Sequence, residues 1–549
     1  MLRYLHSIAG TLLCCAATSL VLAAAPHAGS HYSLSLTLDH KNGDRISDVA
    51  DITARVQSTA IIQKVEFRVD GTLRATVTSV PYRFSWDTLA DTEGQHTLTA
   101  TAYDENGSTA RAGVKLIIDN QLGEGAAAMD AKAQAALSIN DTDAARRYAR
   151  RAVKVDPQDT AALTVLADLA AQNGDIDTAI STLEKARGAS TDSATMLKLA
   201  GYLAQRALTP DYQTRFFVEA QKIAALRQSA ADMAVESARK SGDPIRIGDA
   251  LMNACRFSEA ILAYRPAVKD VETAPVSAID RLALADVMSD KLIDASNLLR
   301  PVEYTGRADA GTHAVHSLAY LRNRQFTQAR EIIAEGDLSG HNPAALMAAA
   351  YADYALSRPD EAFKEAKEAA GLLPGSPDAL FCLAIANKDP VDEEQDMLKS
   401  LLSTPFEAGP YDDYAARQSI KAKAGPINEA LAITDYVLKR DPGDVYARII
   451  QVMSYIQQDR FEEAQPILAG LIRSEPRAPD ILMAESVWWN VKKNSTQAAE
   501  FLASAGQADV KRFSFTEAQT PPQFLYLLNH TLRYRAGFFL TPASLTGKS

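Results

Sequence analysis

The sequence contains very little cysteine, with four cysteines among 549 residues. Two of them, Cys14 and Cys15, lie within the first 25 residues, so only Cys255 and Cys382 remain in the rest of the chain. Two cysteines this far apart do not make the dense disulfide framework of small secreted domains. Both lie in apolar patterns of helical spacing, and we expect buried free thiols rather than a disulfide.

The sequence also lacks a surplus of positive charge, because 57 Lys and Arg stand against 68 Asp and Glu, for a net charge of −11. A protein that binds the phosphate backbone of a nucleic acid needs a basic surface. The charge balance therefore argues against a nucleic-acid partner, and the ordinary hydrophobic content of 47% predicts folded domains.

Long hydrophobic runs are absent after the first 25 residues, so we expect no transmembrane span in the mature chain. The first 25 residues combine Arg3 with an apolar stretch from Leu12 to Leu22 and the small residues 23–25. This pattern predicts a cleavable signal peptide over residues 1–25. We therefore expect a protein of the periplasm or one that is secreted.

Sequence motifs of catalysis are missing as well. No glycine-rich phosphate loop stands between a strand and a helix, and neither GxSxG nor HExxH occurs. His313 and His316 are three residues apart on a predicted helix and could share a metal, but no third ligand is evident. We predict no enzyme activity, no cofactor and no metal site.

Residues 31–119 have the alternation of half-buried strands. Val65, Phe67 and Val69 alternate with charged residues, and the turn Asp70-Gly71 follows. The alternation returns at residues 84–86 and 98–102, before a second turn at residues 104–107. Several short strands at this spacing predict a β-sandwich.

The residues of this region also resemble a known family. The runs 65–71 (VEFRVDG), 81–87 (PYRFSWD) and 94–100, with Gly94 and the stretch HTLTA, are similar to bacterial Ig-like domains. The resemblance covers about ninety residues and implies that Trp86 packs between the sheets instead of forming a ligand platform. Such modules serve many extracellular proteins as spacers or adhesive units, so the resemblance names no function.

The periodicity changes to helical after residues 120–125, which we interpret as a linker. One alanine can be followed along the chain at intervals of 33 to 35 residues, with one double interval of 68, at Ala260, Ala295, Ala329, Ala362, Ala430, Ala464 and Ala498. Two antiparallel helices approach closely where a small side chain faces the partner helix. The period therefore predicts stacked helical hairpins over residues 126–511.

This pattern of period, alanines and terminal prolines resembles the tetratricopeptide repeat. The fold class we expect is multidomain, an N-terminal all-β Ig-like sandwich followed by an all-α superhelical solenoid of about eleven hairpins. Residues 194–246 depart from the pattern as an enlarged unit, and Pro266, Pro301 and Pro466 should kink or shorten their helices. The resemblance implies a concave surface that binds other proteins.

Two groups of residues are candidate partner-binding sites. Four arginines form a basic stripe on one helix, for which a solvated face is the alternative: Arg146, Arg147, Arg150 and Arg151. Trp488 and Trp489 are adjacent on a predicted helix and point about 100° apart, so one is expected to pack and the other to be available as a binding anchor.

Residues 512–549 form an aromatic-rich tail, interpreted as a cap over the last apolar face of the array or, alternatively, as a docking element. Taken together, these patterns favour an exported, non-catalytic protein-interaction scaffold of the bacterial cell envelope. Its partners would be other envelope or secreted proteins. The alternative is a glycan- or polymer-binding accessory subunit of a polysaccharide-processing or secretion system.

Overall fold

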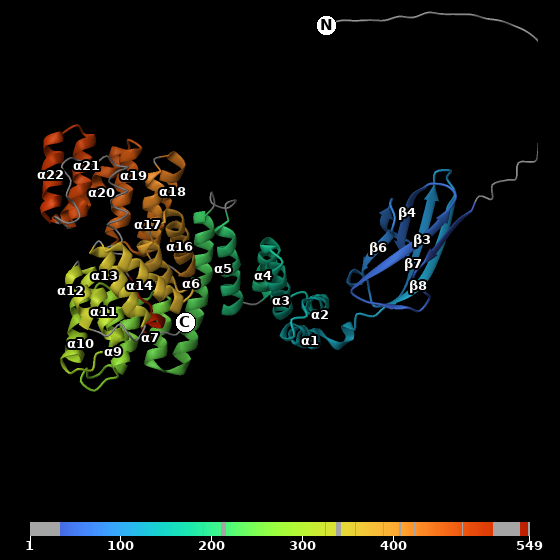
Figure 1. The fold of residues 1–549 in the computed structure, drawn as a ribbon, viewed down its shortest axis with the longest axis horizontal. Coiled ribbons are helices and arrows are strands. Elements are labelled where there is room, and N and C mark those ends of the chain that lie inside the picture. Colours follow the sequence, from blue (N-terminus) through green and yellow to red (C-terminus); the bar gives the residue numbers. More distant parts are fainter. Residues whose placement is uncertain are drawn as a thin grey trace, which may run out of the picture. The chain divides into compact units, whose positions relative to one another are not determined.

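A computed structural model describes residues 33–189, 192–209, 216–323, 325–335, 342–356, 358–387, 389–405, 408–421, 423–474, 476–508 and 539–546. The expected signal peptide lies outside these residues. The chain divides into two compact units between Ala126 and Ala127 (Figure 1).

The first unit is a sandwich of two β-sheets, as the alternation predicts. Strands β1 (Leu34–Leu38), β3 (Val49–Ser58) and β6 (Tyr82–Asp87) form one sheet in the order β1-β3-β6. The other sheet has the order β2-β8-β7-β4-β5, with the strands β2 (Arg45–Ile46), β4 (Ile62–Val69), β5 (Thr72–Val77), β7 (Gly94–Asp104) and β8 (Thr109–Ile118). All pairs are antiparallel except β2 with β8.

Aromatic side chains fill the space between the two sheets, because alternate residues of each strand point inward. Trp86 is 2% exposed, and its ring stacks on Phe84 with the centroids 6.4 Å apart. The indole Nε1 donates a hydrogen bond of 2.8 Å to the carboxylate of Asp91. The expectation that Trp86 belongs to the core is therefore confirmed.

The end of this unit differs from the expected linker over residues 120–125. The side chain of Asn120 is fully buried, and its Oδ1 accepts hydrogen bonds from the Asp48 N–H at 2.7 Å and the Thr88 hydroxyl at 3.1 Å. Leu122 then begins a short 3-10 turn. Asn120 thus belongs to the sandwich, because its amide satisfies buried polar groups that the strands leave unpaired.

The second unit is helical and begins with α1 (Ala126–Ser138), α2 (Thr142–Val155), α3 (Thr160–Gln172), α4 (Ile176–Ala189), α5 (Ser193–Ala207), α6 (Phe216–Ser241), α7 (Pro244–Asn253) and α8 (Phe257–Tyr264). It continues with α9 (Val276–Met288), α10 (Leu292–Tyr304), α11 (Ala310–Arg322), α12 (Phe326–Glu335), α13 (Pro343–Ala355), α14 (Pro359–Leu372), α15 (Pro377–Ala386) and α16 (Pro390–Ser403). The last repeats contain α17 (Ala408–Ile420), α18 (Ala424–Arg440), α19 (Val445–Gln457), α20 (Phe461–Ser474), α21 (Pro479–Val491) and α22 (Ser495–Ala508).

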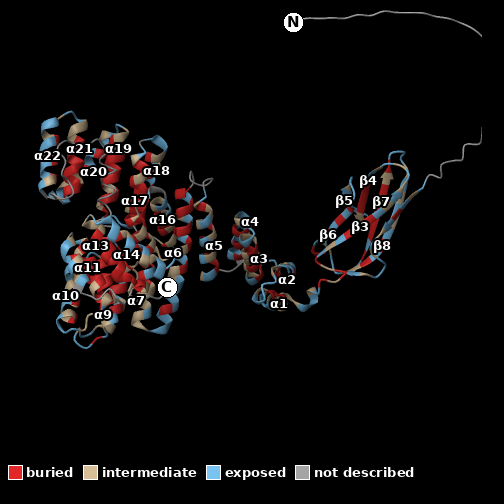
Figure 2. Ribbon diagram, viewed as in Figure 1, coloured by how far each residue is buried: buried red, intermediate tan, exposed pale blue. Residues whose placement is uncertain are grey.

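Consecutive helices from α3 to α22 pack in pairs as antiparallel hairpins, α3 with α4 through α21 with α22. The periodic alanines lie where the second helix meets the first, and each is at most 1% exposed: Ala260, Ala295, Ala329, Ala362, Ala430, Ala464 and Ala498. Figure 2 shows the buried residues gathered along the faces where helices meet. The predicted solenoid is confirmed, and its spacing follows from close helix approach at a small side chain. No helix in the described ranges is long and apolar enough to cross a membrane.

The turn inside many hairpins carries a residue with a left-handed backbone. This residue lies at Asn140, Gly174, Cys255, Asp290, Asp459 and Lys493, with φ between 56° and 82°. The N–H after it bonds back to a carbonyl five residues earlier, as in Arg256 to Leu251 at 2.9 Å, which ends the helix. The helical pattern expected around Cys255 is therefore wrong at that residue, which lies in a turn and is only partly buried. Cys382 is a buried free thiol, as expected.

The expected irregularities have different outcomes. The enlarged unit contains α6, which runs for 26 residues. Pro266 lies in a 3-10 turn after an α8 of eight residues, so it shortens that helix as predicted. Pro301 and Pro466 lie inside α10 and α20, which have total lengths of 13 and 14 residues. Both helices continue past the proline, so neither proline ends its helix.

The array also makes a contact between distant repeats that the period does not predict. Helix α6 packs against α16, and the Arg227 Nε donates a hydrogen bond of 2.6 Å to the Leu402 carbonyl, 175 residues away. The Phe216 ring lies 5.0 Å from the Tyr414 ring. The repeats between α6 and α16 are therefore linked at both ends, which a chain of nearest-neighbour contacts does not do.

Candidate peptide-binding groove

The first helices of five consecutive hairpins, α7, α9, α11, α13 and α15, pack side by side within this linked region. Helix α13 is buried along every residue from Pro343 to Asp353. It packs against α11, α12, α14 and α15, and it also contacts α24 (Pro542–Thr546) at the far end of the sequence. A distant segment thus contributes to the burial of the central helix.

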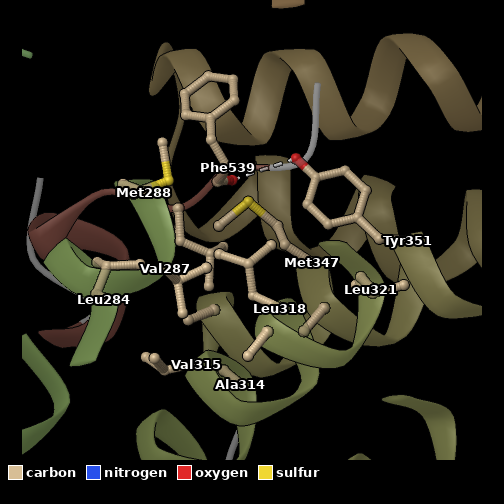
Figure 3. Packing of buried hydrophobic residues seen from close by; sticks show 14 of the residues in the cluster. Leu284, Val287, Met288, Ala314, Val315, Leu318, Leu321, Met347, Tyr351 and Phe539 are labelled. Atoms are coloured by element: carbon tan, nitrogen blue, oxygen red, sulfur yellow. Dashed lines mark hydrogen bonds between the residues drawn. The ribbon is translucent and has the colours of Figure 1, made fainter. Parts of the chain in front are cut away.

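We call residues 539–546 the C-terminal segment. Phe539 and Leu540 are 3% and 2% exposed, and the Phe539 ring lies 5.6 Å from the ring of Phe381 on α15. Figure 3 shows Phe539 beside the packed core, with its carbonyl facing Tyr351. Two buried apolar side chains are the anchors expected of a bound peptide. We call the site on α7, α13 and α15 that holds this segment the groove.

Three side chains of the array hold main-chain atoms of the C-terminal segment. The Asp378 carboxylate accepts a hydrogen bond of 2.8 Å from the Thr541 N–H. The Tyr351 hydroxyl donates to the Phe539 carbonyl at 3.4 Å, and the Asn342 amide donates to the Leu545 carbonyl at 3.4 Å. Hydrogen bonds to the main chain fix the path of a peptide whatever its side chains are.

The two central anchors are buried and oriented by the array itself. Asp378 is fully buried at the start of α15, where its Oδ1 accepts from the Ala379 N–H at 3.0 Å and from the Ser376 hydroxyl. Burial raises the pKa of the fully buried Tyr351 well above its ordinary value, so its hydroxyl remains a donor. The site therefore presents a fixed acceptor at Asp378 and a hydroxyl donor at Tyr351, which lies 3.4 Å from the carbonyl oxygens of both Phe539 and Asp378.

A cavity of about 340 Å³ lies beside the C-terminal segment. Its wall includes Met252, Cys255 and Phe257 around the α7–α8 turn, Met288 at the end of α9, and the segment residues Phe539 and Leu540. The volume of this cavity is at the lower end of the range for pockets that hold small ligands, and apolar side chains form most of its lining. The groove therefore has room for more apolar volume than the C-terminal segment fills.

The expected cap over the last hairpin differs from this arrangement. Residues 509–538 of the aromatic tail lie outside the described residues, so most of that prediction stays open. The described residues of the tail, from Phe539 onward, contact α7 and α13 and pack on α15 instead of α22. The segment reaches the groove because Asp378 and Tyr351 satisfy its backbone there.

The arginine stripe on α2 is not uniformly accessible. Arg147 is exposed and Arg146 and Arg150 are partly buried, whereas Arg151 is only 7% exposed. The Arg151 guanidinium lies 5.6 Å from the centre of the Tyr148 ring. Arg151 thus packs along the helix surface, and a role of the stripe in partner binding stays a prediction.

The adjacent tryptophans on α21 have different environments, as their 100° separation predicts. Trp488 is 8% exposed, packs edge-on against Phe461 at 5.9 Å and carries the Lys492 ammonium 4.9 Å from its ring. Trp489 is partly buried at the edge of the same cluster. Trp489 is the one of the pair with surface left for a partner, and that role stays a prediction.

Both histidines on α11 lie near Glu303, with His313 Nδ1 at 4.0 Å from its carboxylate. His316 is 1% exposed, its Nδ1 lies 2.7 Å from a carboxylate oxygen of Glu303, and its ring stacks on Tyr320 at 4.6 Å. Across the ranges that the structure describes, no cluster of three or more His, Cys, Asp or Glu could hold a metal ion. His316 therefore pairs with Glu303 through Nδ1, whereas its Nε2 has no hydrogen-bond partner among the described residues.

None of the groove anchors was identified from the sequence. Asn342-Pro343 and Pro377-Asp378 have the form of helix-start signals, which explains local capping only. Nothing in the local pattern indicates that Asp378 faces Thr541, because 163 residues separate them. Only the abundance of aromatic residues in the tail hinted that it docks on something.

A second buried carboxyl group lies close to the groove. Asp280 on α9 is 3% exposed, and burial, with the Asp309 carboxylate as the next cause, raises its pKa from 3.8 to about 7. Its Oδ1 has no hydrogen-bond partner among the described residues. Asp280 therefore holds a proton near neutral pH that an unfolded chain releases.

We expect the helical unit to lose stability as the pH rises. The folded-state pKa of Asp280 is raised, so its contribution is complete below about pH 4 and is lost as the pH passes 7. Asp280→Asn, which has no ionisable group, should match the wild type below about pH 4, and its advantage over the wild type should grow by about 2 to 3 kcal/mol between pH 5 and pH 8. Urea unfolding at both pH values measures this, and an equal difference at the two pH values would contradict it.

Comparison with known families assigns the two parts of the chain. Residues 38–100 match the bacterial Ig domain, and residues 131–194 match a tetratricopeptide repeat. No curated protein matches the sequence. The sandwich thus matches a bacterial Ig domain, and the start of the helical array matches a tetratricopeptide repeat, as the resemblances indicate.

Solved structures similar to parts of the chain are distant. The fibronectin(III)-like modules of Clostridium thermocellum CbhA are 24% identical, with a TM-score of 0.14, over 15% of this chain and 96% of theirs. Yeast Tom70 is 13% identical over 70% of this chain and 83% of its own, with a TM-score of 0.29. The Cut9–Hcn1 hetero-tetramer of the APC/C is 11% identical over 73% and 96%, with a TM-score of 0.33.

Proposed function

We propose that this protein is a non-catalytic scaffold of the bacterial cell envelope that binds a segment of another protein in the groove of its helical array. A tetratricopeptide-type fold implies a protein–protein interaction scaffold, and folds of this kind are typically non-catalytic. The observation that carries the proposal is the groove itself, in which Tyr351 and Asp378 bind main-chain atoms of a peptide segment.

The groove suits a peptide for a physical reason. Main-chain donors and acceptors recur in every peptide, so the acceptor at Asp378 and the hydroxyl of Tyr351 can bind many sequences. Apolar side chains then fill the adjoining cavity and set the preference for one partner. We place the Ig domain outside this recognition step, because its largest aromatic side chain, Trp86, is buried in its own core.

The test is affinity capture of the full-length protein from its own envelope fraction with a photo-activated crosslinker, followed by mass spectrometry of the crosslinked peptides. We expect a defined partner protein whose crosslinks fall on helices α7–α16. Trp489→Ala in the same experiment tests whether α21 adds a second contact. Crosslinks confined to residues 33–119, or no protein partner at all, would count against the proposal.

The envelope location rests on the signal-like sequence of residues 1–25. We expect the protein in the periplasmic or secreted fraction, with an N-terminus near Ala24 or Ala25 after cleavage. Cell fractionation and N-terminal sequencing of the endogenous protein measure both. Recovery from the cytoplasm with Met1 intact would contradict export.

The alternative of glycan binding keeps one supporting observation, the partly exposed ring of Trp489. An aromatic face of this kind can stack on a sugar ring. Purified envelope polysaccharide that binds the wild type but not Trp489→Ala would favour this alternative over a protein partner.

A further inference from the structure

The C-terminal segment is attached to the groove in the way a separate peptide would be. Its hydrogen-bond partners Asn342, Tyr351 and Asp378 lie 203, 188 and 163 residues away in the sequence. Helices α7, α9, α11, α13 and α15 contact one another directly and without the segment. The contacts among these helices therefore do not depend on the segment, although Phe539 and Leu540 belong to the same buried cluster.

The segment also carries its own local order. The Thr541 N–H and the Ser544 hydroxyl lie 3.2 Å apart, and the Ser544 hydroxyl donates to the Thr541 carbonyl at 2.6 Å. Pro542 fixes the backbone at the start of α24. A short peptide with this sequence would lose less conformational freedom on binding than an unstructured one.

The fit of the segment to the groove is incomplete. Phe539 and Leu540 line the 340 Å³ cavity without filling it, and Met252, Phe257 and Met288 line it as well. Apolar walls without contact partners forgo the dispersion energy that a filled site gains. A peptide with a larger apolar side chain at this point would therefore bind the same anchors and gain additional contact area.

We propose that the C-terminal segment is a built-in competitor that occupies the peptide site of the array, and that a partner segment of similar chemistry displaces it. The partner segment has two adjacent large apolar residues, followed by Thr-Pro or a similar helix start, and its leading side chain enters the cavity. This inference rests on the proposed scaffold function and adds its partner chemistry and its regulation.

The anchors favour a peptide over a lipid. The groove offers the Asp378 carboxylate, fully buried, to a donor N–H of the ligand. A fatty acid or an anionic lipid headgroup has no such donor and would place a second negative charge there, at a cost in a buried site. Lipid binding is therefore an outcome of the test that contradicts the proposal.

The test uses the full-length chain with Phe539→Asp and Leu540→Asp, which places two charges in the buried site and should release the segment. The probe is a fluorescein-labelled peptide with the sequence of residues 538–547. We expect the released variant to bind the peptide at least tenfold more tightly than the wild type does. In the released background, Asp378→Ala should weaken this binding at least tenfold.

Matched controls separate release from damage to the fold. Ile293 on α10 is 78% exposed, so Ile293→Asp should leave peptide binding at the wild-type level. A peptide of scrambled sequence should not bind. Thr541→Pro is a milder release variant because it introduces no charge. It removes the N–H that Asp378 accepts, together with the contacts that the Thr541 N–H and hydroxyl make with Ser544. If the helical circular dichroism of the double variant is reduced, that variant is misfolded, and peptide binding is then measured on Thr541→Pro.

Three results would overturn the inference. A folded release variant that does not bind the peptide would show that the segment is an integral part of the array, and oleate binding in its place would point to a lipid site. A wild type that binds the peptide as tightly as the release variant would show that the segment does not compete. Affinity capture from the envelope fraction separates failure of the competitor proposal from failure of the scaffold function. If the wild type and the release variant capture the same amount of a partner, the scaffold function stands, but the segment does not compete with that partner.

Discussion

Replacing Gly248 with alanine is expected to destabilise the helical unit by about 3 kcal/mol, the upper end of the usual cost of overpacking. Gly248 lies on α7, and an added Cβ would lie 2.2 Å from Cε1 and 2.4 Å from Cδ1 of Tyr264 on α8. These distances are far below van der Waals contact, so the ring or the helix must move. Urea unfolding followed by circular dichroism measures the loss.

The tyrosine ring has little freedom to move. Tyr264 is fully buried, and its hydroxyl donates a hydrogen bond of 2.6 Å to Asp249, which also accepts from the Arg281 Nε at 3.0 Å. A displaced ring therefore loses packing and breaks a partly buried hydrogen-bond network. The same substitution should loosen the groove, because the adjoining residues Met252 and Phe257 line its cavity.

The control is Gly201→Ala on α5, where nothing lies within 4 Å of the added Cβ. Alanine has the higher helix propensity, so this variant should gain up to about 1 kcal/mol. Pairing Gly248→Ala with Tyr264→Leu should recover part of the lost stability by making room for the Cβ. Equal stability of the two single glycine variants would contradict the steric account.

Replacing Trp86 with alanine is expected to destabilise the Ig domain by about 4 kcal/mol, which is a large part of the stability of a domain this small. The indole is 2% exposed, stacks on Phe84, meets His96 edge-on at 6.1 Å and donates a hydrogen bond to Asp91. Removing it leaves a cavity between the sheets and an unpaired carboxylate oxygen. Calorimetry of the full-length protein measures the effect.

Because the chain forms two compact units, we expect two calorimetric transitions, of which Trp86→Ala lowers only the one that belongs to the sandwich. Ile61 is 69% exposed in the same unit, so Ile61→Ala should leave both transitions almost unchanged. A shift of both transitions by Trp86→Ala would show that the two units unfold together.

Local patterns predicted most of the fold. Alternation of period two placed the strands around Phe67 and Trp86, and the alanine period of about 34 residues placed the contact between the helices of each hairpin. These signals are reliable because they record contacts between residues close in the chain. The predictions that were wrong, the linker role of Asn120 and the helical setting of Cys255, concern residues at element ends, where capping and turn geometry decide the structure.

The sequence by itself thus determined the two kinds of domain, the hairpin repeat and the core positions. Each of these follows from the spacing of buried apolar and small residues, which can be read within a short stretch of the chain. The tertiary structure alone decided the packing of α6 on α16 and the seating of Phe539 among Tyr351, Phe381 and Asp378. Those contacts join residues more than 150 positions apart through single side chains with no period. Their energy depends on complementary shape and on satisfied buried polar groups, which become visible only when the array has folded.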